Sequence, residues 1–185
     1  MISDAPSTGR IAFIGADRQV HVIGVDGHGR RQVTWSKVPS ALTLWGGSSG
    51  QDTCSWPGFS PDGRWLICFQ SEGSTDELTG SRICAVEIDG VEERCLAELT
   101  GQLPIYAQWN DRSSEIAILV QEEDELQLWL CELAQVGQAR IVDHGVPLFF
   151  NWAPGGGQVM LHAGDATRRT GRLVMRSMEP VGEDI

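Results

Sequence analysis

The sequence contains no long apolar segment. Hydrophobic residues make up 41% of the 185 residues, but no run of them approaches the ~20 consecutive apolar residues that span a bilayer. The first ten residues contain polar, acidic and small residues, rather than the basic region followed by an apolar run that forms a secretory signal peptide. We therefore expect no membrane span and a cytoplasmic protein.

Positive charge is scarce along the chain. Lysine and arginine number 14 against 25 aspartates and glutamates, which gives a net charge of −11. The arginines form no cluster beyond the pairs Arg30-Arg31 and Arg168-Arg169. Because nucleic-acid binding needs several cations that face phosphates, we expect no nucleic-acid partner. The acidic excess is typical of a soluble surface.

The cysteines and histidines lack the spacing of metal ligands. The five cysteines include no C-x-x-C pair, and the four histidines form no H-x-H or H-E-x-x-H pattern. A zinc site needs such closely spaced ligands, so we expect no metal and no cofactor. Cys68, Cys84 and Cys131 lie in apolar runs, where a reduced cysteine behaves as a small hydrophobic residue.

What the sequence does contain is a repeat. Three segments begin with an aromatic anchor, continue through a short polar turn and reach an apolar strand; they start at Phe59, Trp109 and Trp152, with spacings of 50 and 43 residues. A period in the forties without helical periodicity is typical of the four-stranded blades of a β-propeller. The sequence therefore predicts an all-β fold.

Further strands follow each anchor. Asp89-Gly90 separates the apolar runs 83–88 and 93–96, and Asp26-Gly27 separates 20–25 and 31–34. Asp-Gly between apolar runs predicts a hairpin, because glycine accepts the positive φ of a tight turn. Several of these strands are apolar on both faces, as expected for sheets that are covered on both sides.

The segment Phe59-Ser60-Pro61-Asp62-Gly63, followed by two strands and Asp-Gly, resembles the repeat of TolB-like (WD-repeat-like) β-propellers. The likeness is strongest at 59–96, fair at 11–34, and degenerate at 109–142 and from 152 onward. It implies a partial β-propeller of about four blades that corresponds to an incomplete or N-terminal portion of such a protein. Motifs of this kind specify architecture better than function.

The predicted domain organisation is a single propeller-like domain over 11–179, between a flexible terminus at 1–10 and a tail at 180–185. Its units are 11–35, 56–99, 105–143 and 147–179, with three, four, four and three strands. Three arrangements fit this count: a piece of a larger ring, a compact four-bladed ring, or two chains that complete one ring.

Two motifs with possible chemistry have simpler interpretations. Gly46-Gly47-Ser48-Ser49-Gly50 matches the G-x-S-x-G nucleophile elbow, but no strand–turn–helix context surrounds it, so we expect a linker. The acidic run 122–125 is expected at a hairpin tip, where charge keeps strand edges apart. His144 and His162 come from different units and are expected near one end of their blades.

The candidate binding residues come from the predicted inner strands. The anchors Trp109 and Trp152 are expected in the core. By the period-two rule, residues one and three places before each anchor share one side of the inner strand. The ligand-binding candidates of this set are Trp56, Tyr106, Gln108, Phe149 and Asn151. The alternative for the same residues is packing between neighbouring blades.

The sequence therefore favours a non-enzymatic binding scaffold. The resemblance implies a protein or peptide partner, and self-association that completes the ring is a further expectation. The alternative is a propeller domain associated with a hydrolase, either peptidase-gating or glycan-acting, whose catalytic part is absent from this chain. An enzyme would be expected to gather carboxylates on its inner strands, whereas the predicted inner set is aromatic and amide-rich.

Overall fold

The computed structural model describes residues 9–35, 53–74, 77–90, 92–165 and 170–178. Over these ranges the chain is all-β, and no helix that could span a membrane is found among them. The segment 46–50, the tail 180–185 and all but the last two residues of the expected flexible terminus 1–10 lie outside the described residues.

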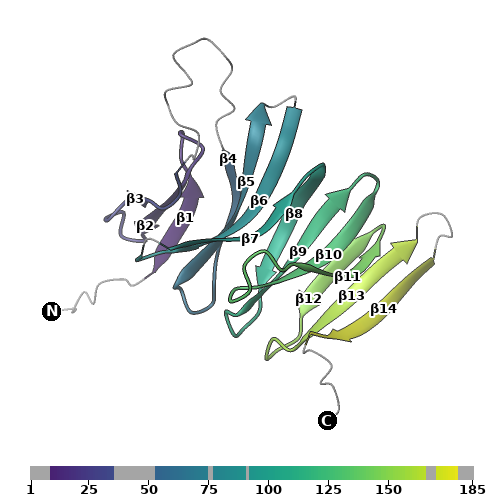
Figure 1. Cartoon of the computed structure of the whole chain (residues 1–185). Helices are drawn as coiled ribbons and strands as arrows, with labels where there is room; N and C mark the ends of the chain where they lie inside the picture. The colour runs from purple at the N-terminus through teal and green to yellow at the C-terminus, as the bar shows by residue number, and fades with distance from the viewer. Residues whose placement is uncertain (1–8, 36–52, 75–76, 91, 166–169, 179–185) are drawn as a thin grey trace.

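The described strands form four antiparallel sheets (Figure 1). The first sheet contains β1 (Arg10–Ile14), β2 (Val20–Gly24) and β3 (Arg31–Gln32). The second contains β4 (Thr53–Phe59), β5 (Trp65–Ser74), β6 (Glu77–Glu87) and β7 (Glu93–Leu99). The third contains β8 (Gln102–Trp109), β9 (Glu115–Glu122), β10 (Glu125–Glu132) and β11 (Arg140–Gly145). The fourth contains β12 (Leu148–Trp152), β13 (Gln158–Asp165) and β14 (Thr170–Ser177).

A recurring backbone hydrogen bond shows which strands are equivalent. The residue after β2, β6, β10 and β14 donates its backbone N–H to the carbonyl of the residue before β1, β5, β9 and β13, at 2.8–3.0 Å in each sheet. The first sheet therefore begins at the second strand position and has no described innermost strand. The fourth sheet ends at the third position and has no described outermost strand. The predicted counts of three, four, four and three strands are confirmed for the described chain.

The sheets stack face to face in sequence order. We call the face turned toward the following sheet the forward face, and the opposite one the backward face. Three buried apolar clusters fill the three junctions; they centre on Leu66 between the first and second sheets, Ile118 between the second and third, and Leu161 between the third and fourth. Each middle sheet is thus buried on both faces, which explains strands that are apolar in both registers.

The four sheets form an open stack, with the first and the last sheets at opposite ends (Figure 1). The forward face of the fourth sheet carries exposed apolar side chains, Leu173 at 70% and Phe149 at 61% among them. A closed four-bladed ring would bury that face against the first sheet. The compact four-bladed ring is therefore not what the chain forms, and the partial propeller is confirmed.

The tryptophan anchors join neighbouring sheets. Trp109 and Trp152 are each 6% exposed. The Trp109 indole N–H donates to the carbonyl of Gly58 at 3.1 Å, and the Trp152 indole N–H donates to the carbonyl of Gln108 at 3.0 Å. Each acceptor directly precedes the anchor position of the previous sheet, so one hydrogen bond recurs at both junctions. The second sheet has Phe59 at this position, where the preceding sheet has no described inner strand to offer a carbonyl.

The turn after each anchor keeps its backbone while its side chains change. The backbone N–H of Ser60, Asn110 and Ala153 donates to the carbonyl five residues later at 2.9 Å. In the second sheet the Ser60 hydroxyl also accepts from the Trp65 N–H at 3.0 Å. In the third sheet the Asn110 amide oxygen accepts from two backbone N–H groups of the same turn. Asparagine therefore replaces serine without loss of the turn.

Replacing Trp109 or Trp152 by phenylalanine should destabilise the protein, because each change removes the donor and leaves a partly buried carbonyl unpaired. We expect a loss of about 1 kcal/mol per site in the free energy of unfolding, measured by urea titration. Trp65→Phe is the matched control, since Trp65 is 5% exposed and none of the described side-chain bonds uses its indole N–H as a donor. Equal losses in all three variants would contradict the role of the inter-sheet hydrogen bond.

Candidate functional site

Three aromatic rings form a row across the inner strands of the second, third and fourth sheets. Trp56 of β4 contacts Tyr106 of β8 edge to face, with ring centroids 5.0 Å apart. Tyr106 contacts Phe150 of β12 in the same manner, at 5.4 Å. Such edge-to-face pairs are favourable beyond the area that they bury. The row therefore links three sheets along their innermost layer.

Trp56 is held in an unusual backbone conformation. Its φ is +53°, in the left-handed region that bulky side chains rarely adopt. It lies at a register shift of β4 between Ser55 and Gly58, and its indole N–H donates to the Ala107 carbonyl at 3.1 Å. The side chain is nevertheless 41% exposed. Strained conformations of this kind cluster at functional sites, where the surrounding structure maintains them.

Two amides extend the row. The Gln108 side-chain N–H donates to the Asn151 side-chain oxygen at 3.4 Å, which joins β8 to β12. The Gln108 side-chain oxygen is buried and has no hydrogen-bond partner among the residues that the structure describes, whereas Asn151 is exposed. The inner layer therefore presents both hydrogen-bond donors and acceptors beside the rings.

Phe149 lies apart from the other predicted site residues. Its side chain points to the forward face of the fourth sheet, where it stacks on His162 with ring centroids 6.1 Å apart. The third aromatic of the row is instead Phe150, on the backward face. Trp56, Tyr106, Gln108 and Asn151 are thus brought together, and Phe149 is not. The difference arises because no described sheet follows the fourth one.

Two of the predicted site residues, Tyr106 and Gln108, lie on the forward face of the third sheet. In register, Tyr106 pairs with Leu119 and Gln108 with Ala117, and both partners belong to the junction with the fourth sheet. Side chains of an inner strand point to the neighbouring sheets, because alternate residues occupy the two faces of a strand. The candidate site is therefore the accessible inner rim of two junctions. Phe150, which the period-two rule excludes, joins it from the facing sheet.

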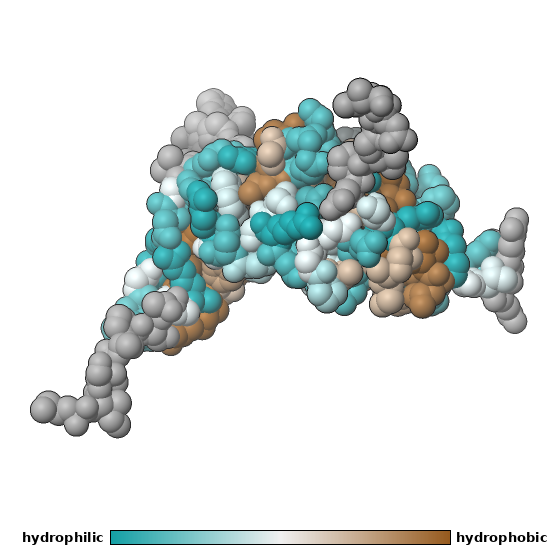
Figure 2. All heavy atoms as spheres, turned by 90° about the horizontal axis from the view of Figure 1, so that it is seen from below, coloured by the Kyte–Doolittle hydropathy of each residue, from teal (hydrophilic) through white to brown (hydrophobic). Residues whose placement is uncertain are grey.

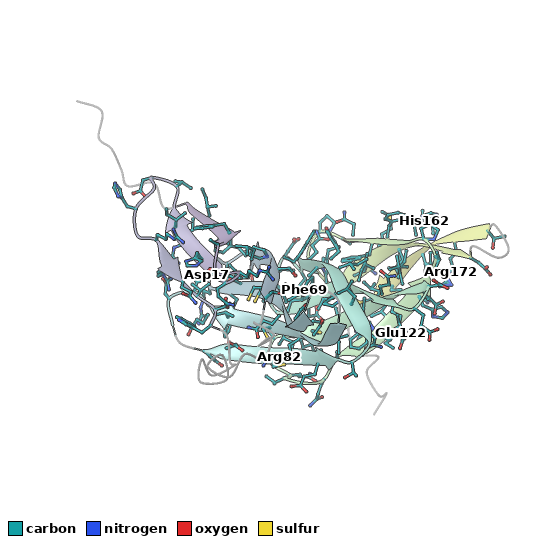
Figure 3. All side chains as sticks on the ribbon, turned by 90° about the horizontal axis from the view of Figure 1, so that it is seen from above. Asp17, Phe69, Arg82, Glu122, His162 and Arg172 are labelled. Atoms are coloured by element: carbon teal, nitrogen blue, oxygen red, sulfur yellow. The ribbon has the colours of Figure 1, made fainter. Side chains whose placement is uncertain are left out.

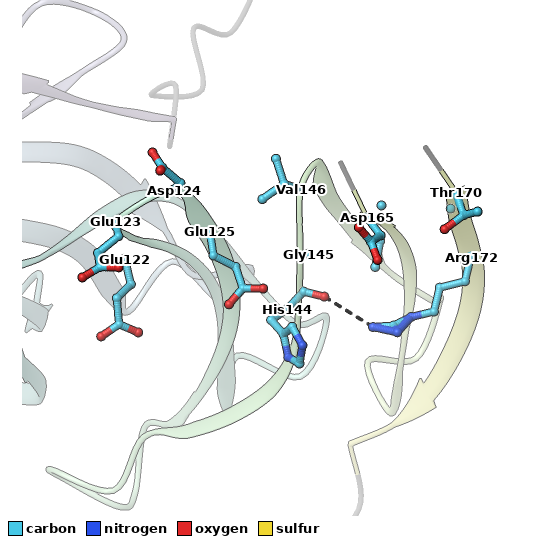
Figure 4. Close-up of a pocket in the computed structure, with 13 residues that line it drawn as sticks. Glu122, Glu123, Asp124, Glu125, His144, Gly145, Val146, Asp165, Thr170 and Arg172 are labelled. Atoms are coloured by element: carbon cyan, nitrogen blue, oxygen red, sulfur yellow. Dashed lines mark hydrogen bonds between the residues drawn. The ribbon is translucent and has the colours of Figure 1, made fainter. Parts of the chain in front are cut away.

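A second candidate is an acid-lined recess of about 870 Å³ at the hairpin ends of the third and fourth sheets (Figure 4). The acidic run 122–125 forms the β9–β10 hairpin tip, as the sequence predicts. Glu122 accepts hydrogen bonds from the side chains of Gln102 and Gln127. No group of three or more His, Cys, Asp or Glu side chains in the described chain is placed to hold a metal ion.

The one described cation that lines this recess is already bound. Arg172 of β14 donates to Asp143 of β11, and Arg176 lies 3.4 Å from the other carboxylate oxygen. The Asp143 side chain is 5% exposed. Burial raises the pKa of this carboxyl, but the backbone N–H of His144 and the Arg172 guanidinium more than offset it, so the pKa lies below its usual value. The pair of arginines ties the fourth sheet to the third.

A weaker version of the same arrangement joins the first two sheets. Arg10 and Arg31 both donate to Asp89, at 2.8 and 2.7 Å. The Asp89 side chain is 67% exposed. Because water solvates exposed ion pairs well, this contact contributes little stability.

The fold and these sites define a class of protein, the partial β-propeller. No protein-family model matches the sequence, and none of the curated proteins matches it. Among solved structures, an oligogalacturonate lyase in complex with manganese is similar, with a TM-score of 0.63 and 14% identity over 92% of this chain and 45% of that chain.

Two further solved structures are similar. TolB from Acinetobacter baumannii has a TM-score of 0.60 and 12% identity over 94% of this chain and 40% of that one. A puromycin hydrolase has a TM-score of 0.61 and 13% identity over 89% of this chain and 28% of that one. This chain spans less than half the length of each of the three, and at such identity the likeness establishes the fold alone.

Replacing Asp143 by asparagine should cost about 2 kcal/mol of stability, because two guanidinium groups lose a buried, charge-assisted acceptor. Asp89→Asn is the matched control and should cost at most about 0.5 kcal/mol, since its carboxylate is exposed. Urea unfolding at neutral pH measures both. A loss in the Asp143 variant no larger than in the control would show that the fourth sheet does not depend on this ion pair.

The Asp143 contribution should also depend on pH. The folded pKa lies below the value of about 3.9 in the unfolded chain, so in this window the unfolded state binds more protons and stability rises with pH. We expect the stability difference between wild type and Asp143→Asn to be fully present above about pH 5 and to shrink as the pH falls below 4. A difference that stays constant down to the acid-unfolding limit would contradict the lowered pKa.

Proposed function

We propose that this chain is a non-enzymatic binding module that holds a protein or peptide segment on its inner-strand row. The observation that carries the proposal is the convergence of Trp56, Tyr106, Gln108 and Asn151 from three strands of three separate sheets. The row combines aromatic surface with amide donors and acceptors. Rings of this kind bury much area at low entropic cost, which suits them to protein recognition.

The chemistry of the row favours binding over catalysis. Trp56, Tyr106, Gln108, Phe150 and Asn151 include no carboxylate, no imidazole and no cation. Tyr106 is the one titratable side chain among these five, whereas general acid–base hydrolysis commonly uses an acid together with a base. Amides instead suit the main chain of an extended peptide, because each supplies a donor and an acceptor. The strained, half-exposed Trp56 supports a binding role, since its conformation costs stability.

The partner class follows from the surroundings of the row. A chain of net charge −11 disfavours polyanions such as nucleic acids and acidic polysaccharides. An uncharged aromatic and amide surface suits a polypeptide segment with apolar side chains. Likeness to TolB over 40% of that chain supports a TolB-like module, which we propose as the family of this chain. A cytoplasmic location remains part of the proposal.

A second candidate function is the propeller portion of a hydrolase. It is supported by the likeness to puromycin hydrolase, of which this chain covers 28%. In that case the catalytic groups would belong to a different segment of polypeptide, and the row would face the substrate on its way to them.

Selection of random peptides displayed on phage against the immobilised protein tests the first function. We expect enriched peptides whose affinity falls at least about tenfold for Trp56→Ala and for Asn151→Ala, because these are an exposed ring and an exposed amide of the row. Val136→Ala is the control; Val136 is 54% exposed and lies between β10 and β11. Peptides that bind all three variants equally would place the site elsewhere. Hydrolysis of an aminoacyl p-nitroanilide by this chain would overturn the non-enzymatic assignment.

A further inference from the structure

The stack of four sheets has one open sheet face at each end. On the forward face of the fourth sheet, Phe149, Met160, Leu173 and Met175 are all exposed, by 43–70%. These residues lie in register across three strands: Met160 pairs with Met175, and His162 pairs with both Phe149 and Leu173. Contiguous exposed apolar surface of this kind marks an interaction site in a soluble protein.

The backward face of the first sheet is the opposite open face. Ile11 is 49% exposed there, and it pairs with Ile23 of β2. Phe13 pairs with His21, and the Arg30 guanidinium covers the Phe13 ring at 5.3 Å. Figure 2 shows hydrophobic atoms toward both ends of the stack of sheets, and Figure 3 places Asp17 of the first sheet and His162 of the fourth toward opposite ends.

The two open faces have matching chemistry. Each carries a phenylalanine stacked on a histidine of the neighbouring strand, Phe13 on His21 at 5.6 Å and Phe149 on His162 at 6.1 Å. By the recurring backbone hydrogen bond, the second-sheet position equivalent to His162 is Phe69, which is buried in an internal junction. The terminal faces thus keep the apolar layout of the internal junctions and add an imidazole ring. His21 is 7% exposed, and its Nε2 lies 2.9 Å from a carboxylate oxygen of Asp17.

One open face is a forward face and the other is a backward face, which is the combination found at every internal junction. Every internal junction buries the forward face of one sheet on the backward face of the next. The fourth sheet offers a forward face, and the first sheet offers a backward one. Both sheets have three described strands. A second copy of the chain therefore supplies the type of face that each end lacks.

We propose that two copies of this chain associate head to tail, with the last sheet of each packed on the first sheet of the other. This inference rests on the open faces and not on the proposed function. A closed pair uses each open face once, and it leaves neither exposed. The histidines then lie inside the two new junctions, beside the phenylalanines on which they stack.

The area favours the closed pair over a single junction. The smaller first sheet limits the contact, because its strands have five, five and two residues; at ~3.4 Å per residue and ~4.8 Å between strands its face measures about 200 Å². One junction therefore buries about 400 Å² over both sides, which is in the range of crystal-packing contacts. Two junctions bury about 800 Å², which is below standard stable interfaces and typical of a weak association. The pair should consequently form only when both junctions close, and at high protein concentration.

Size-exclusion chromatography with multi-angle light scattering tests the proposal. At high protein concentration the wild-type chain should give twice the mass of 20.2 kDa. Leu173→Asp on the fourth sheet and Ile11→Asp on the first should each give a monomer, because either change places a charge in both junctions. Ile141→Asp is the control: Ile141 is 56% exposed on β11, away from both open faces, and this variant should remain a dimer. Circular dichroism confirms that each variant is folded.

Mixing one variant of each open face distinguishes head-to-tail pairing from other dimers. In a mixed pair, one junction joins the intact faces of both variants, and the other junction joins the two altered faces. We therefore mix Leu173→Asp with Ile11→Lys, so that the two introduced charges are opposite and attract each other in the second junction. We expect equal amounts of these two variants to recover part of the dimer that neither forms alone.

Four results would overturn the proposal. A wild-type chain that stays monomeric at high protein concentration would show that the open faces do not associate. A ladder of masses would show an open chain of copies. A dimer lost only in Leu173→Asp would indicate that two fourth sheets pack on each other. Absence of any recovery in the mixture would exclude head-to-tail pairing.

Discussion

The structure depends on the burial of both faces of each middle sheet. A four-stranded sheet that is apolar on both sides, such as the one that contains Leu66 and Ile67, is stable only between two neighbours. Each fully buried leucine or isoleucine contributes about 1.5–3 kcal/mol, so the three junctions supply most of the stability. The aromatic row depends on how neighbouring sheets are aligned at these junctions. The open faces occur where the first and fourth sheets have no further described sheet against them.

Alignment comes from a few polar contacts at the junctions. The indole N–H groups of Trp109 and Trp152 fix each inner strand to the one before it. The Asp143–Arg172 pair fixes the outer part of the last junction. These contacts also place the aromatic row, because Trp56 meets Tyr106 only when β4 and β8 are held in this relation. The candidate binding surface is therefore a product of the inter-sheet packing.

Much of the fold was predictable because its signals are local. The aromatic–turn–strand repeat, the Asp-Gly turns and the apolar runs indicated the strands, their grouping and the core position of the anchors. The site was predictable only in part. Period-two alternation placed Tyr106 and Gln108 on one face, but it gave no sign that Phe150 meets them from the facing sheet. It equally gave no sign that Phe149, at the position equivalent to Tyr106, has no described sheet in front of it.

The sequence by itself determined the elements and their repeat, because strand formation and turn geometry depend on residues close together in the chain. Tertiary structure decided which faces are covered. Leu173 and Leu161 lie on adjacent strands of similar apolar character, yet one is 70% exposed and the other is fully buried. Burial depends on whether another sheet lies opposite, and that neighbour is tens of residues away or in another molecule. Local sequence cannot encode this, since the same alternating pattern serves a covered face and an open one.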